Sequence, residues 1–119
     1  MTGVKEHSER RLRRDDRALA VETDRDGDGT IVLQLYGEFD LASVPIFEAE
    51  LARAEAELGP LVIDLSRLEF IDSTGISQLL AAHTRAEGDE RELVFLKGPP
   101  SVEKILRITG LDQILRFEG

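Results

Sequence analysis

The run Asp72-Ser73-Thr74-Gly75 is the part of the sequence whose residue types and spacing point most directly to chemistry. An apolar run, residues 61–65, precedes it by a short connector, and a helical pattern follows from residue 76 to residue 86. Unpaired amide groups at a helix N-terminus attract anions, including a phosphate carried by a serine. Ser73 is therefore a candidate phosphorylation site. When unmodified, Ser73 is also the predicted N-cap of this helix, with its hydroxyl oxygen accepting one backbone amide. The alternative is that Ser73 is only this cap.

Hydrolytic chemistry at Ser73 would require a base within hydrogen-bond reach. The histidines are His7, near the N-terminus, and His83, ten residues further along the same predicted helix. At about 1.5 Å of rise per residue, His83 lies roughly 15 Å from Ser73, too far to act as its base. The flanking residues also lack the G-x-S-x-G pattern of a nucleophile elbow. We therefore predict that the protein is not an enzyme, and that His83 packs at the margin of the core.

An acidic run between two predicted strands resembles the start of a calcium loop. Asp24, Asp26 and Asp28 match the first ligand positions of an EF-hand, but Leu35 stands where that loop requires a bidentate glutamate. The residues after Gly29 also have the β-branched content of a strand instead of an exiting helix. The run therefore predicts a tight hairpin turn and no calcium site.

Three carboxylates are a second candidate metal site. Asp40, Asp64 and Asp72 lie in or just after predicted strands, where carboxylates sometimes bind Mg²⁺, but their spacing does not require a metal. The chain has no cysteine, so thiolate metal sites and disulfides are excluded. It also lacks both glycine-rich phosphate-binding patterns, so we predict no metal and no cofactor.

Length and charge limit the class of protein and of partner. A chain of 119 residues, 41% hydrophobic, has room for one domain with one core. No apolar run approaches the ~18 residues of a membrane span and no signal-peptide core follows Met1, so we expect a cytoplasmic protein. The net charge of −9 argues against nucleic acid as the main ligand and favours a protein partner.

The charge is unevenly distributed along the chain. Residues 1–17 hold six Lys/Arg and four Asp/Glu, whereas the rest holds nine Lys/Arg and twenty Asp/Glu. The basic stretch is Arg10-Arg11-Leu12-Arg13-Arg14, which is suited to an acidic partner or a membrane surface. We expect residues 1–17 to be a flexible Arg-rich tail, and residues 18–119 to form the folded domain.

The rest of the sequence alternates strand and helix patterns. Strands are predicted at residues 18–23, 30–36, 61–65 and 93–96, with a short last strand at 114–117. Ser43 and Ser101 are the predicted N-caps of a first and a third helix. The residues of 61–65 are apolar without alternation, as expected for a central strand buried on both faces. We therefore predict a single α/β domain: a mostly parallel mixed sheet with an N-terminal hairpin, packed with about three helices.

Three segments in this order resemble the landmarks of the STAS domain family. They are residues 37–41 (GEFDL), residues 61–76 (LVIDLSRLEFIDSTGI) and residues 102–111 (VEKILRITGL). The resemblance covers residues 18–117. Two features depart from the family pattern: the Arg-rich tail, and an end at Gly119, where many relatives continue into a closing helix.

The stand-alone members of this family are anti-sigma factor antagonists, and the resemblance implies their mechanism. The unmodified protein would bind an anti-sigma factor that is also a serine kinase, and so release a sigma factor. Phosphorylation of Ser73 would end that binding, and a serine phosphatase would restore it. Asp40, Asp72, Ser73, Thr74, Gly75 and Ser77 would form the contact with the partner and kinase.

The resemblance leaves a second role open. The protein would then be a non-switching STAS interaction subunit of a stress-signalling or lipid-transport assembly, with a structural Ser73. In either role we expect a monomer or a weak dimer.

Overall fold

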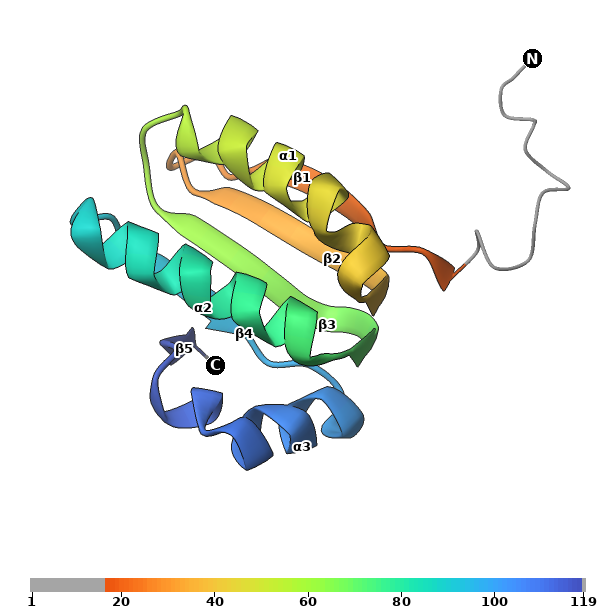
Figure 1. Cartoon of the computed structure of the whole chain (residues 1–119). Helices are drawn as coiled ribbons and strands as arrows, with labels where there is room; N and C mark the ends of the chain where they lie inside the picture. The colour runs from red at the N-terminus through yellow and green to blue at the C-terminus, as the bar shows by residue number, and fades with distance from the viewer. Residues whose placement is uncertain (1–16, 119) are drawn as a thin grey trace, which may run out of the picture.

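The computed structural model describes residues 17–118. Its strands form one five-stranded sheet in the order β1-β2-β3-β4-β5 (Figure 1). β1 (Ala20–Arg25) runs antiparallel to β2 (Ile31–Phe39). β3 (Leu61–Ile71), β4 (Leu93–Leu96) and β5 (Phe117–Glu118) continue the sheet in parallel. The predicted mostly parallel sheet with an N-terminal hairpin is confirmed.

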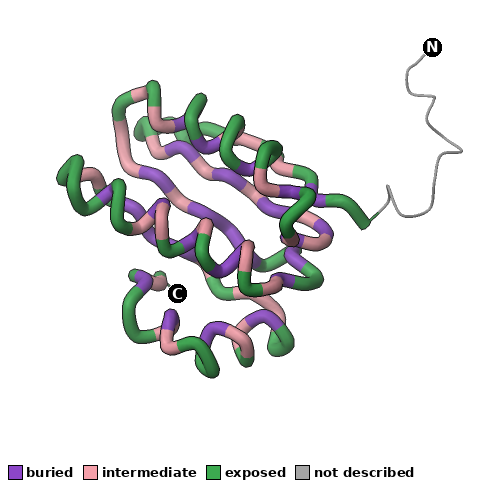
Figure 2. The backbone as a smooth tube through the Cα atoms, in the orientation of Figure 1, coloured by how far each residue is buried: buried purple, intermediate pink, exposed green. Residues whose placement is uncertain are grey.

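Three α-helices connect the parallel strands, as predicted. They are α1 (Val44–Glu55), α2 (Ser73–Gly88) and α3 (Pro100–Thr109). Because the strands are ordered sequentially and such crossovers are right-handed, all three helices pack on the same face of the sheet. Figure 2 shows buried and half-buried residues alternating along the central strands, with exposed residues on the outer faces of the helices. Phe39, Phe47 and Phe95 are fully buried in the core between helices and sheet.

The central strands are longer than their sequence patterns predict. β2 continues through Gly37, whose positive φ of 87° accommodates a shift in the pairing with β3. β3 continues past residue 65 to Ile71, so the predicted connector is itself strand. A second irregularity follows Asp64, whose carboxylate accepts the Ser66 amide at 2.9 Å. Both strands consequently end together, with Phe39 paired to Ile71.

Several local predictions change at the helix ends. Ser43 occupies the N-cap position of α1 but accepts no helix amide with its side chain. Ser101 is not the cap of α3, because that helix begins at Pro100 with Pro99 as its N-cap. The last strand is Phe117–Glu118, after a 3-10 helix at Leu111–Gln113.

The β1–β2 hairpin turn is confirmed, but it lies at residues 26–30, because Asp24 and Arg25 belong to β1. The Asp28 carboxylate accepts the Thr30 amide at 3.0 Å, and this bond lowers the pKa of Asp28 below its ordinary value. Leu35, the twelfth position of the EF-hand pattern, is fully buried in β2. Within residues 17–118 no helix is long and apolar enough to cross a bilayer.

Candidate functional site

The site is built where β2 and β3 end and α2 begins. The Asp72 amide donates to the Phe39 carbonyl oxygen at 3.1 Å, which ties the two strand ends together. Asp40 directly follows Phe39, and Asp72 directly follows Ile71. Strand pairing therefore brings the two aspartates to the same edge of the sheet, next to Ser73.

Asp72, and not Ser73, is the N-cap of α2. Its Oδ1 accepts the amides of Thr74 at 2.9 Å and Gly75 at 3.1 Å. Its own backbone is extended, with φ −107° and ψ −172°, which directs the carboxylate over the first turn. The prediction that Ser73 caps this helix is therefore wrong. The two amides expected to be open to a phosphate already bind a carboxylate.

Ser73 is the first residue of α2 and its side chain is exposed to solvent. Within residues 17–118 its hydroxyl makes no hydrogen bond, whereas its carbonyl oxygen accepts the hydroxyl of Ser77 at 3.0 Å. Ser77 is also exposed, one helical turn further along, and Thr74 is half-buried. The hydroxyl of Ser73 is thus available to a kinase without breaking a contact of the described fold.

Gly75 allows α2 to start this close to the strand ends. A Cβ atom placed on Gly75 would lie 2.7 Å from Ile71 Cγ1 and 3.0 Å from both Phe39 Cγ and the Phe39 carbonyl oxygen. These distances are shorter than normal van der Waals contact, so a side chain here would push the helix away. The glycine therefore sets the position of Ser73 relative to Asp40 through packing.

Asp40 is held by a polar contact with the start of α1. Ser43 Oγ lies 2.8 Å from Asp40 Oδ1 and 2.9 Å from the Glu38 carbonyl oxygen. This explains why Ser43 does not cap α1, because its hydroxyl is used to fix the turn after β2. Ser43 is itself buried, at 4% exposure.

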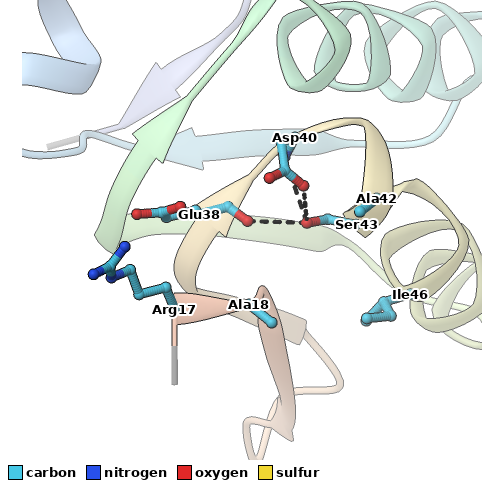
Figure 3. A pocket seen from close by; sticks show the side chains of 7 residues that line it. All are labelled: Arg17, Ala18, Glu38, Asp40, Ala42, Ser43 and Ile46. Atoms are coloured by element: carbon cyan, nitrogen blue, oxygen red, sulfur yellow. Dashed lines mark hydrogen bonds between the residues drawn. The ribbon is translucent and has the colours of Figure 1, made fainter. Parts of the chain in front are cut away.

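A pocket of about 530 Å³ opens beside Asp40 (Figure 3). Arg17 and Glu38 lie on one side of it and Ile46 on the other, with Asp40 next to Ser43. No pattern along the sequence indicates this pocket. The GEFDL segment contains two of its acidic residues, but Arg17, Ala18 and Ile46 come from other elements.

Exposed apolar side chains near the site are a second feature that no sequence pattern indicates. Leu41, directly after Asp40, is 71% exposed, and Phe70, two residues before Asp72, is 48% exposed. Apolar groups beside acidic ones are typical of a protein-binding surface. Periodicity gave no signal for them, since both residues lie outside the predicted strands and helices.

Two other predicted candidates lie away from this site. Asp64 is buried within β3, where its carboxylate accepts the Ser66 amide. Among residues 17–118 no three carboxylate or histidine groups are arranged to hold a metal ion, so Asp40, Asp64 and Asp72 do not form a cluster. His83 is half-buried on α2, with its Nε2 3.6 Å from Glu87 Oε2.

A protein-family model described as "Mlab, STAS domain" matches residues 9–116. Among characterised proteins, the chain is 30% identical over 93 residues to RsfB, an anti-sigma-F factor antagonist of Mycobacterium tuberculosis. That match covers 77% of this chain and 75% of RsfB.

Solved structures show the same fold. An anti-sigma factor antagonist from Mycobacterium paratuberculosis has a TM-score of 0.74 at 28% identity, covering 85% of this chain and 86% of that one. The antagonist SpoIIAA in its unphosphorylated form has a TM-score of 0.69 at 24% identity, covering 84% of this chain and 89% of that one. The phosphorylated form of Bacillus SpoIIAA has a TM-score of 0.63 at 22% identity, covering 84% and 92%.

Proposed function

Because the chain belongs to the STAS domain family, we propose that it is an anti-sigma factor antagonist controlled by phosphorylation of Ser73. In the unphosphorylated state it binds an anti-sigma factor that is also a serine kinase, and a sigma factor is released. Phosphorylation of Ser73 ends this binding, and a serine phosphatase restores it. The observation that carries the proposal is the exposed Ser73 hydroxyl beside the Asp72 cap.

In this proposal the negative charge of the phosphate on Ser73 switches partner binding off. A phosphate on Ser73 adds about −1.5 to −2 charges next to the carboxylate of Asp72 and near Asp40. At an interface with a partner these charges would have to be desolvated beside like charges, at a cost of several kcal/mol. Each ~1.4 kcal/mol changes affinity tenfold, so one modification is enough to dissociate a complex of ordinary affinity.

The fold should tolerate the same charge. Asp72 supplies the cap of α2, so the helix start does not depend on an unmodified Ser73. The positive end of the helix dipole also favours an anion at this position. The likeness of this fold to both the unphosphorylated and the phosphorylated SpoIIAA structures supports this part of the proposal.

The partner-binding surface consists of the exposed or half-buried residues Asp40, Asp72, Ser73, Thr74 and Ser77. Gly75 is buried and contributes by holding the start of α2 against the strand ends. The carboxylates of this surface suit a basic partner surface, and the adjacent exposed Leu41 offers an apolar anchor. The described helices contain no membrane span, and we place this exchange of partners in the cytoplasm.

Substitutions at Ser73 test the switch directly. Ser73→Ala should bind the cognate anti-sigma factor like the wild type but take up no phosphate. Ser73→Asp should bind at least tenfold more weakly, because even one added charge opposes desolvation at the interface. Titration calorimetry gives both affinities, and phosphopeptide mass spectrometry after incubation with the kinase and ATP identifies the site.

Ser101→Asp is the matched control. Ser101 is also exposed in the first turn of a helix, α3, but lies outside the proposed surface. It should leave the affinity unchanged. Equal affinities for Ser73→Asp and the wild type would refute the switch, as would phosphate found only on Thr74 or Ser77.

A second candidate role stays open because the match to the family model shows the domain family and not the partner of the chain. The chain would then be a constitutive STAS subunit of a stress-signalling or lipid-transport assembly. In that role Ser73→Asp would reduce affinity no more than Ser101→Asp does, and the partner kinase would not modify the chain.

A further inference from the structure

The pocket beside Asp40 has two acidic residues, one basic residue and an apolar wall, so its charged residues sum to a net negative charge. Glu38 and Asp40 contribute two carboxylates, Arg17 contributes one guanidinium on the side of Glu38, and apolar surface comes from Ala18, Ala42 and Ile46 (Figure 3). Ile46 is 42% exposed, which is high for a large apolar side chain. Such a pocket fits a long basic side chain, whose aliphatic part packs on the apolar wall while its charged group meets the carboxylates.

The chain itself carries such side chains immediately before the pocket. Arg17 and Ala18 form part of its wall, and Arg10-Arg11-Leu12-Arg13-Arg14 precedes them by two residues. A fully extended residue spans at most ~3.6 Å, so the Cα of Arg14 lies within about 11 Å of the Cα of Arg17, and that of Leu12 within about 18 Å. Chain connectivity therefore keeps this segment within reach of the pocket.

The composition of the segment matches the pocket. Arginine guanidinium groups pair with carboxylates through two parallel hydrogen bonds, and Leu12 supplies an apolar centre between the two arginine pairs. Because the segment is tethered, its effective concentration at the pocket reaches the millimolar range, so weak contacts are sufficient. A second copy of the folded domain suits the pocket less well, because it would bring its own carboxylates, Glu38 and Asp40, against the same charges.

We propose that the basic segment, residues 10–14, binds in cis to the pocket lined by Glu38, Asp40, Ala42 and Ile46. Asp40 belongs both to this pocket and to the partner-binding surface. The bound segment therefore covers one side of that surface and competes with the anti-sigma factor; this second step rests on the proposed function. The chain thereby limits its own affinity for its partner before any phosphorylation.

Docking is tested without a partner, by NMR on the full chain. One variant neutralises the segment (Arg10→Gln, Arg11→Gln, Arg13→Gln and Arg14→Gln), and Glu38→Gln weakens the pocket. We expect the fourfold variant to shift the amide resonances of Ala42 and Ile46. In the Glu38→Gln background the same four substitutions should shift the Ala42 and Ile46 resonances much less, because one of the two pocket carboxylates that bind the segment is already missing.

A second fourfold variant controls for net charge. It neutralises Lys97, Lys104, Arg107 and Arg116, which are all exposed and do not line the pocket. It should leave the Ala42 and Ile46 resonances in place. Unchanged resonances in the segment variant, or equal shifts with and without Glu38, would overturn the proposal.

The effect on the partner is measured separately. The segment variant should bind the cognate anti-sigma factor about two- to tenfold more tightly than the wild type, the range expected when one or two exposed ion pairs no longer compete. The control variant should show no such gain. Weaker binding by the segment variant would assign these arginines to the partner interface and overturn the competition. If the anti-sigma factor binds no variant, the proposed function fails, while the NMR result still decides whether the segment docks.

Discussion

At the scale of single residues, the main finding is that Asp72 caps α2 while Ser73 keeps a free position for its side chain in solvent. The Asp72 carboxylate accepts two amides of the first turn of α2, from Thr74 and Gly75. With Asp72 at the cap, Ser73 is moved one position into the helix, where its side chain points into solvent. Helix capping and phosphorylation, which were predicted for one residue, are thus assigned to two neighbours.

This division predicts unequal effects on stability. Asp72→Ala leaves the Thr74 and Gly75 amides without their acceptor and should lower the free energy of unfolding by about 1 kcal/mol. Ser73→Ala should change it by less than about 0.5 kcal/mol, because an exposed side chain without a fixed partner is removed. Urea denaturation followed by circular dichroism measures both. A larger loss for Ser73→Ala than for Asp72→Ala would contradict the assignment of the cap.

At the scale of elements, the contact between α2 and the ends of β2 and β3 determines the geometry of the site. Only a residue without a side chain fits at Gly75 against Ile71 and Phe39. The helix N-terminus is therefore held directly against the strand ends. A change at this contact would move Ser73 and Asp72 together, away from Asp40.

Gly75→Ala tests this contact. Overpacking against Ile71 and Phe39 should cost about 1–3 kcal/mol of stability, which outweighs the gain in helix propensity. Gly88→Ala is the matched control, since Gly88 ends the same helix and a Cβ there would meet no atom within 4 Å. The control should be neutral or stabilising by up to about 1 kcal/mol. Equal responses in thermal and urea unfolding would show that packing at Gly75 is unimportant.

At the scale of the whole molecule, one end of the sheet carries the candidate site and the other end is stabilised by the contacts of one arginine side chain. The end at Ser73 carries the candidate site and the pocket beside Asp40. At the opposite end Arg91, just before β4, ties together segments that are far apart in the chain. Its guanidinium donates to the carbonyl oxygens of Gly59 at 2.8 Å and Glu55 at 3.0 Å, and also to those of Ala54 and Glu57. One side chain thus satisfies the C-terminal end of α1 and the loop into β3.

Removal of the Arg91 guanidinium should lower the free energy of unfolding of the whole domain. Arg91→Met keeps the aliphatic part of the side chain but leaves several carbonyl groups without donors, and should cost about 2 kcal/mol of stability. Arg85→Met is the control, because Arg85 makes an exposed ion pair with Glu55 at 3.1 Å, worth at most about 1 kcal/mol. Chemical denaturation of both variants provides the comparison. Similar losses would mean that Arg91 acts only as a surface charge.

Local signals were sufficient to predict much of this protein from its sequence. The alternation of strand and helix patterns predicted the mixed sheet, its N-terminal hairpin and the three helices. The Asp and Gly residues of the run correctly indicated a hairpin turn, since turn residues act over a few neighbouring positions. The position of Ser73 at the start of a helix also followed from the sequence, because helix periodicity is itself a local property.

Other features were decided by the tertiary structure. β3 extends to Ile71 because its polar second half pairs with β2, which no periodicity in residues 66–71 indicated. The choice of Asp72 over Ser73 as the cap follows from the direction in which the paired strand ends deliver the backbone to α2. The pocket beside Asp40 and the anchoring of Arg91 join residues far apart in the chain. Patterns along the sequence report local periodicity, whereas these features depend on strand register and on the competition of side chains for backbone groups.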